Sequence, residues 1–78
     1  MRRRWQDRIA IDPEIHHGDP CISGTRVPVS VIVGSIADGD GIDDLLKSYP
    51  QLTAADVRAA LHFAAEAVNR FDLIPIPD

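Results

Sequence analysis

The chain has 78 residues and a net charge of −4, with 45% hydrophobic and 26% charged residues. This length predicts one domain, and the balance of residues is that of a folded globular protein rather than a disordered chain. The single cysteine excludes an internal disulfide, and no apolar run approaches the ~20 residues that a membrane span needs. No apolar segment follows the charged start, so we expect no secretory signal and a cytoplasmic protein.

Charge is divided unevenly along the chain. Residues 1–8 contain Arg2, Arg3, Arg4 and Arg8 against Asp7, and the remaining residues carry the acid. We therefore expect a basic arm at residues 1–7 on an acidic body. Such an arm either contacts nucleic acid or an acidic partner, or it is a solvated terminus without a partner.

The segment after the arm favours a β-hairpin. "RIAID" (8–12) alternates in polarity and is β-branched, which predicts a short strand, and "DPEIHHGDP" (12–20) is typical of turns. "CISGTRVPV" (21–29) then returns as extended chain, because Gly24 permits a positive φ and Pro28 keeps Val27 out of the α region. Whether the hairpin pairs within one chain or across a dimer is left open.

Apolar spacing changes to that of a helix at Val29. The i, i+3, i+4, i+7 pattern predicts a first helix from Val29, which "DGDG" (38–41) ends. A second short helix is predicted by the same spacing at Ile42, Leu45, Leu46 and Tyr49. Pro50 stops it.

The third predicted helix is apolar over most of its girth. Thr53 caps it, and Asp56 three residues later makes a variant of the capping box. One face is lined by Val57, Leu61, Ala64, Val68 and Phe71. A second apolar edge is formed by Ala60, Phe63 and Ala67, which leaves a narrow polar stripe at Arg58, His62, Glu66 and Asn69. Such a helix is buried on more than one side, so we expect oligomerisation or a stable partner.

The last residues form an apolar tail that cannot be helical. "DLIPIPD" (72–78) contains Pro75 and Pro77, which forbid a helix. An extended apolar tail is either folded onto its own core or offered to another chain by strand addition. Both alternatives stay open.

Most of the chain resembles a known family. Residues 22–66, "ISGTRVPVSVIVGSIADGDGIDDLLKSYPQLTAADVRAALHFAAE", are similar to the bacterial domain of unknown function 433, and "GTRVPV" with "YPQLT" are the most specific blocks. The resemblance covers about residues 8 to 67. It departs at Gly41, where the family usually has a serine cap, which weakens capping by only a few tenths of a kcal/mol.

The resemblance implies a fold and a function class. The expected fold is mostly α with a small N-terminal β-hairpin, a helix-turn-helix-like three-helix domain at residues 8–70 between the arm and a tail at 71–78. Such proteins look like VapB-type antitoxins, whose usual neighbour is a PIN-like nuclease toxin, and the family has no established enzymatic activity. We therefore expect an antitoxin of a type II toxin–antitoxin pair that neutralises such a toxin and binds operon DNA.

The expected binding residues follow from the tail and the arm. Toxin binding is assigned to Arg70, Phe71, Leu73, Ile74 and Ile76. DNA binding is assigned to Arg2, Arg3, Arg4, Thr53 and Arg58. From Asp38 to Asp56 there are five acids and one lysine, which repel phosphates, so DNA binding depends on the arm and on oligomerisation. The alternative function is a stand-alone homodimeric transcription regulator. The operator, the toxin's substrate, the stoichiometry and whether DNA is bound at all are left open.

No pattern in the sequence predicts catalysis, a metal or a cofactor. His16, His17 and Cys21 lack the spacing of a zinc site, and the acids around 38–44 lack the order of an EF-hand. No nucleophile is paired with a base, so we expect no enzyme. Arg26 lies between glycine and proline, where its guanidinium either pins the hairpin internally or contacts a partner directly.

Overall fold

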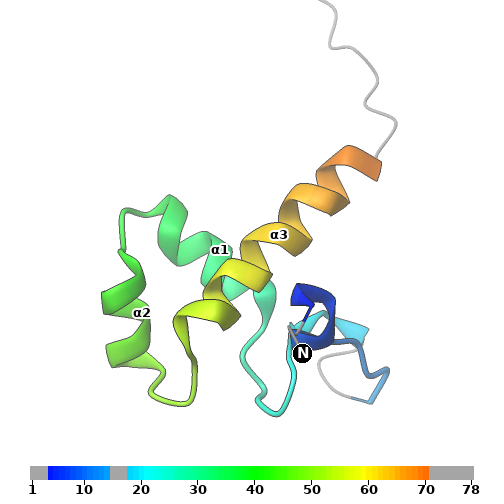
Figure 1. The fold of residues 1–78 in the computed structure, drawn as a ribbon, viewed down its shortest axis with the longest axis horizontal. Helices are drawn as coiled ribbons and strands as arrows, with labels where there is room; N and C mark the ends of the chain where they lie inside the picture. Colours follow the sequence, from blue (N-terminus) through cyan, green and yellow to red (C-terminus); the bar gives the residue numbers. More distant parts are fainter. Residues whose placement is uncertain (1–3, 15–17, 71–78) are drawn as a thin grey trace, which may run out of the picture.

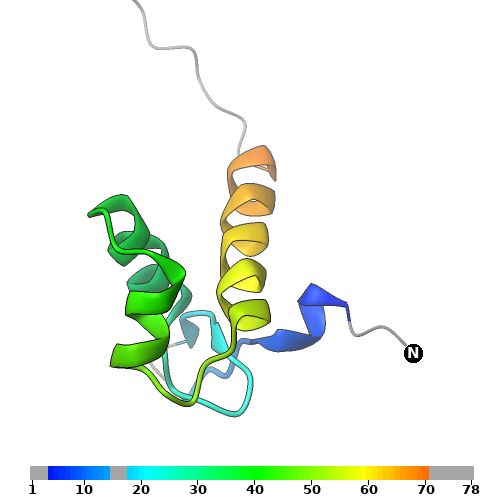
Figure 2. The same ribbon diagram turned by 60° about the vertical axis from the view of Figure 1, so that its left-hand side comes forward.

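The computed structural model describes residues 4–14 and 18–70. Their elements, in chain order, are the 3-10 helix η1 (Trp5–Arg8), β1 (Ile9–Ala10), β2 (Cys21–Ile22), α1 (Val29–Ala37), α2 (Ile42–Ser48) and α3 (Ala54–Arg70). The described part of the chain is mostly helical, with a short hairpin near the N-terminus (Figure 1). α3 lies in the middle, with α1 and α2 on one side and η1 on the other (Figure 2).

The hairpin pairs within the chain. β1 and β2 are antiparallel, with Ile9 opposite Ile22 and Ala10 opposite Cys21. β1 is shorter than the strand predicted at residues 8–12, because the residues at both ends of that range belong to other local structures. Arg8 closes η1, and the carboxylate of Asp12 accepts a hydrogen bond from the backbone N–H of Glu14 at 2.9 Å, which starts a turn.

A tight corner connects β2 to α1. Gly24 adopts a φ of +77°, the left-handed region that glycine reaches without steric cost. The hydroxyl of Thr25 donates to the carbonyl of Ile22 at 2.8 Å and accepts from the N–H of Val27 at 3.1 Å. This corner directs the chain into α1, as the glycine and proline pattern predicts. Arg26 is exposed in the corner, and its role as a pin stays a prediction.

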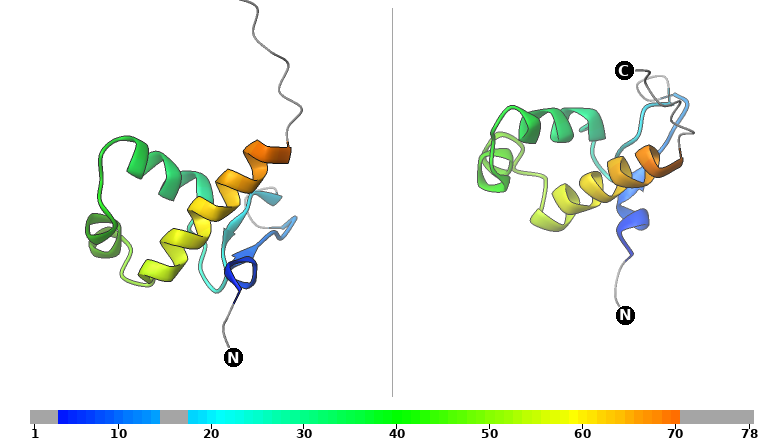
Figure 3. Two further views of the ribbon diagram at one scale, coloured as in Figure 1. Left: turned by 45° about the horizontal axis from the view of Figure 1, so that its top comes forward. Right: turned by 90° about the horizontal axis from the view of Figure 1, so that it is seen from above.

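The core draws side chains from the hairpin, the corner and all three α-helices. Its buried members are Ile22, Val27, Val29, Ile32, Leu45, Leu52, Val57 and Ala60. The largest fully buried side chains are Ile22, Ile32, Leu45 and Val57. The core therefore sits where α1 and α2 pack on the first half of α3, and the views in Figure 3 show these helices together.

The structure decides which apolar face of α3 meets the core. Ala60 is buried and Phe63 packs against the core, so the second apolar edge faces inward, and Val57 at the start of the first face is buried as well. Leu61 and Val68 are 36% and 57% exposed, so most of the other face points outward. The physical reason is that α1 and η1 pack on α3 from two sides, which places Asp56, Val57, Ala59 and Ala60 in the interior.

Among the helices of the described residues, none combines the length and the apolar character needed to cross a membrane.

Candidate interaction surface

A buried carboxylate attaches the N-terminal segment to the start of α3. Asp56 is only 8% exposed, and its Oδ1 accepts a charge-assisted hydrogen bond from Nη1 of Arg8 at 3.0 Å. Its Oδ2 accepts from the N–H of Thr53 at 3.0 Å, and its own N–H donates to Oγ1 of Thr53 at 3.2 Å. The predicted capping box is therefore present, and the same carboxylate also holds η1.

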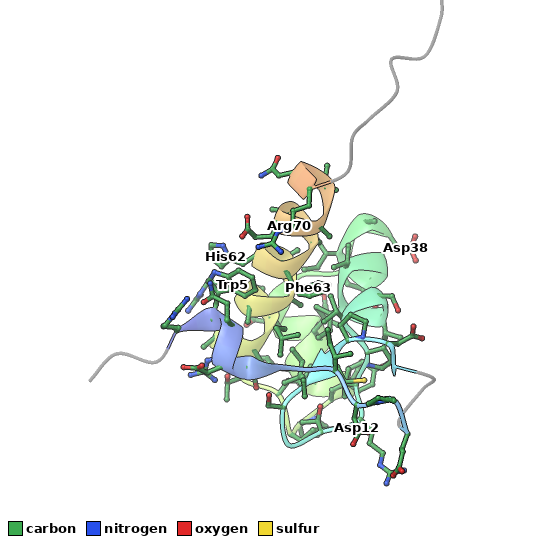
Figure 4. All side chains as sticks on the ribbon, turned by 90° about the vertical axis from the view of Figure 1, so that its right-hand side faces the viewer. Trp5, Asp12, Asp38, His62, Phe63 and Arg70 are labelled. Atoms are coloured by element: carbon green, nitrogen blue, oxygen red, sulfur yellow. The ribbon has the colours of Figure 1, made fainter. Side chains whose placement is uncertain are left out.

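An aromatic pair makes a second attachment further along α3. The rings of Trp5 and His62 are stacked, with centroids 5.6 Å apart and planes 16° apart, and they lie side by side in Figure 4. Because Asp56 and His62 are six residues apart, the two attachments lie about 9 Å apart along the helix axis. The segment from Trp5 to Arg8 is thereby fixed as a wall beside α3.

A groove runs between this wall and α3. One hollow of about 250 Å³ is lined by Trp5, Gln6, Phe63, Glu66, Ala67 and Arg70. A second of about 230 Å³ is lined by Trp5, Gln6, Ile9, Ile11 and Phe63. The hollows share three side chains and form one continuous surface, which we call the η1–α3 groove. Its walls are mostly apolar, and the exposed ion pair of Arg70 and Glu66, at 3.8 Å, lies at its outer end.

The outer half of α3 contributes no buried residue. The buried residues of this helix end at Ala60, and none of the ten described residues from Leu61 to Arg70 is buried. Six of these ten are apolar: Leu61, Phe63, Ala64, Ala65, Ala67 and Val68. A helical segment of this length is marginal in water without tertiary packing. The outer half of α3 therefore has the apolar composition of a buried helix, yet its side chains are exposed or half-buried.

The predicted toxin-binding residues meet this surface at one point. Arg70 is exposed at the end of α3 and lines the η1–α3 groove. The remaining predicted residues, Phe71, Leu73, Ile74 and Ile76, lie outside the described residues. The tail sequence thus begins where the groove ends.

The predicted DNA-binding residues are spread over two elements. Arg2 and Arg3 lie outside the described residues, and Arg4 is exposed immediately before η1. Thr53 is exposed, but its hydroxyl already accepts the hydrogen bond that caps α3. Arg58 is exposed on α3, four residues before His62, the residue on which Trp5 stacks.

Of His16, His17 and Cys21, the structure describes Cys21 alone. Cys21 is buried in β2, and its Sγ donates to the carbonyl of Asp19 at 3.4 Å. His16 and His17 lie outside the described residues. Within residues 4–14 and 18–70, no group of three or more His, Cys, Asp or Glu side chains is placed to hold a metal ion.

Two residues of the groove wall were missed by sequence reasoning. Trp5 and Arg8 were assigned by composition to a basic arm or its boundary, whereas both contact α3. The available signal was Trp5 itself, because a large aromatic side chain within a run of arginines is better placed against a folded surface than in solvent.

Comparison with known proteins is consistent across sequence and structure. Residues 9–64 match the sequence profile of the family described as "Protein of unknown function (DUF433)". The chain is 36% identical over 56 residues to "Uncharacterized protein y4eO" from Sinorhizobium fredii (strain NBRC 101917 / NGR234). That match covers 72% of this chain and 25% of the relative, so the chain spans about a quarter of the length of this curated protein.

The fold is also similar to a solved structure. The crystal structure of a DUF433 member protein from Anabaena variabilis ATCC 29413 superposes with a TM-score of 0.77 at 35% sequence identity. The superposition covers 83% of this chain and 64% of that chain. Since the profile match spans well over half of the sequence and the fold agrees, the chain belongs to the DUF433 family of proteins of unknown function.

Proposed function

We propose that this protein is an antitoxin that binds and neutralises a PIN-like nuclease toxin through the η1–α3 groove and the tail that follows α3. The observation that carries the proposal is the mostly apolar η1–α3 groove, which reaches Arg70 at the end of α3, where the apolar tail sequence follows. Large exposed apolar surfaces mark sites of protein or membrane interaction or ligand-binding grooves. The VapB-type resemblance supplies the class of partner.

The tail sequence suits an extended mode of binding. In an extended strand, successive N–H groups point to opposite edges, so Pro75 and Pro77 remove donors from one edge only. The tail is therefore able to join a sheet as its outermost strand, with its apolar side chains in pockets of the partner. Arg70 at the base of the tail supplies a guanidinium for the carboxylates of an acidic, metal-using site.

The proposal predicts that the apolar tail side chains carry toxin binding. Changing Leu73, Ile74 and Ile76 together to serine removes about 4 kcal/mol of apolar contact and weakens the complex by roughly a thousandfold. The measurement is the dissociation constant, by calorimetry, for the full chain and the toxin-like product of the neighbouring reading frame. Nuclease activity of that product should be inhibited by the wild-type chain and not by the variant.

The matched control is Val31→Ser, which removes an exposed apolar side chain of α1 and lies outside the η1–α3 groove. It should bind as the wild type does. An unchanged dissociation constant for the tail variant would contradict the assignment of binding to the tail.

A second function, binding of operon DNA, is supported by the position of Arg4, the last arginine of the arm. The stack of Trp5 on His62 holds the residue next to Arg4 against α3, about one helical turn from the exposed Arg58, which supports a shared role of the two arginines in binding phosphates. Phosphate contacts give a salt dependence of binding with a slope of about −0.9 per contact. A basic arm on such a domain is one way to supply those contacts.

The arm is therefore expected to set the salt dependence of DNA binding. Replacing Arg2, Arg3 and Arg4 with alanine should flatten the slope of log K against log salt by roughly one unit per lost phosphate contact. Fluorescence anisotropy with operon DNA between 50 and 200 mM salt, a range in which phosphate binding changes strongly, measures it. Lys47→Ala, an exposed cation on α2, should leave the slope unchanged. Equal slopes for the arm variant and the wild type would exclude the arm as the phosphate-binding element.

A further inference from the structure

α3 carries a second surface, separate from the η1–α3 groove. Its residues follow one another at alternating spacings of four and three: Ala54, Arg58, Leu61, Ala65 and Val68. All are exposed except the half-buried Ala54, and none of them lines the groove. This spacing is the a/d pattern by which one helix packs along another. We call this set of five residues the α3 seam.

The seam is already shaped to accept a side chain. Four side chains surround an open hollow of about 220 Å³: Arg58, Leu61, His62 and Ala65. These positions are i, i+3, i+4 and i+7, which is the set that forms a hole for a knob from a facing helix. The seam therefore has the surface shape that one helix of a packed pair presents to the other helix.

We propose that the occupant of this seam is α3 of a second copy, running antiparallel. In that arrangement Leu61 of each subunit lies over Ala65 of the partner subunit, so a large side chain meets a small one twice about a two-fold axis. Such alternation lets the layers interdigitate, and the same patch serves on both subunits.

Charge complementarity selects the antiparallel direction. The same register places Arg58 over Val68 of the partner subunit, within the last turn of its α3, which ends at Arg70. The final carbonyls of a helix lack intrahelical partners, and the macrodipole makes that end negative, so it attracts a guanidinium. A parallel pair would instead place the two Arg58 side chains against each other. Arg58 is the only charged residue of the seam.

The surroundings of the seam favour a second copy of this acidic chain. Each subunit has a net charge of −4, so two copies repel wherever their carboxylates meet. Beside the seam, the flanking positions of α3 that are not fully buried are Ala55, His62, Ala64 and Asn69, none of which is an acid. Along α3 itself, two copies can therefore approach through this face without facing carboxylates. In such a dimer the arm, rather than Arg58, is left to contact DNA.

The oligomeric state in solution tests the proposal. Leu61→Glu and Ala65→Glu each place an unpaired carboxylate in the seam and should raise the dimer dissociation constant by roughly a hundredfold. Val31→Glu is the matched control, since Val31 is 37% exposed and Leu61 is 36% exposed, both on helices. Sedimentation equilibrium should give dimers for the wild type and the control and monomers for the seam variants, with equal helical circular dichroism. A monomeric wild type, or dimeric seam variants, would overturn the proposal.

Cysteine cross-linking tests the direction of the pair. The lone Cys21 is buried, and Cys21→Ala provides a background without other thiols. In that background, a mixture of Leu61→Cys and Ala65→Cys chains should form a disulfide-linked dimer on oxidation, and neither chain alone should do so efficiently. Efficient linking of Ala65→Cys chains to each other would indicate a parallel pair and overturn the antiparallel arrangement.

The dimer proposal and the toxin-binding proposal can be tested independently of each other. The serine variant of the tail should remain dimeric, and Leu61→Glu should still bind the toxin, because the seam shares no residue with the η1–α3 groove or the tail.

Discussion

Replacing Asp56 with alanine is expected to lower the free energy of unfolding by about 3 kcal/mol. The change removes the partner of Arg8, whose side chain is 24% exposed, and it also removes one half of the capping box with Thr53. Breaking a buried pair by deleting one member costs about 3 to 5 kcal/mol, and losing a cap costs about 1 kcal/mol. We take the lower end because Arg8 regains partial hydration when its partner is removed.

Urea denaturation followed by circular dichroism measures this effect. Glu66→Ala is the matched control, because it removes a carboxylate that also faces an arginine on α3, at 3.8 Å, but with side chains that are 49% and 81% exposed. An exposed pair of this kind contributes less than about 0.5 kcal/mol. Equal stability of the two variants would show that burial of Asp56 does not determine the strength of its contacts.

Replacing Ile32 with alanine is expected to cost about 3 to 4 kcal/mol. Ile32 is fully buried in α1 and belongs to the core cluster that packs α1 against α3. Truncating such a side chain loses its transfer free energy and leaves a cavity, a combined cost of about 2 to 5 kcal/mol. A domain of this size has a total stability of roughly 4 to 12 kcal/mol, so the variant loses a large part of it.

The adjacent residue provides a control for this substitution. Val31 belongs to the same helix and is also β-branched, but it is 37% exposed, so Val31→Ala should change stability by less than about 1 kcal/mol. Thermal and urea unfolding of both variants measure the difference. A similar loss for both would mean that helix propensity, rather than burial, governs the stability of α1.

Local sequence signals predicted the elements of the fold well. The spacing from Val29 and the caps around Gly41 and Thr53 lead to α1, α2 and α3 close to where the structure has them. Gly24 adopts the positive φ that its place in the corner required. These features depend on residues close in sequence, and such residues carry their own conformational preferences.

Contacts between distant residues were not predictable in the same way. α3 is apolar on two edges, so its spacing alone did not show that Phe63 faces the core while Leu61 and Val68 face outward. The packing of η1 on α3 helps to determine which edge faces inward. η1 is attached to α3 through Arg8 and Asp56, which are 48 positions apart in the sequence. The η1–α3 groove depends on that attachment, and no local pattern indicates it.

Because Trp5 is attached to α3, its intrinsic fluorescence reports on the η1–α3 groove. The chain contains one tryptophan, and its indole lines both hollows of the η1–α3 groove. Indole emission responds to the polarity of its surroundings. Any molecule that fills the groove displaces water from beside this one fluorophore, so occupancy is readable in the unlabelled wild-type protein.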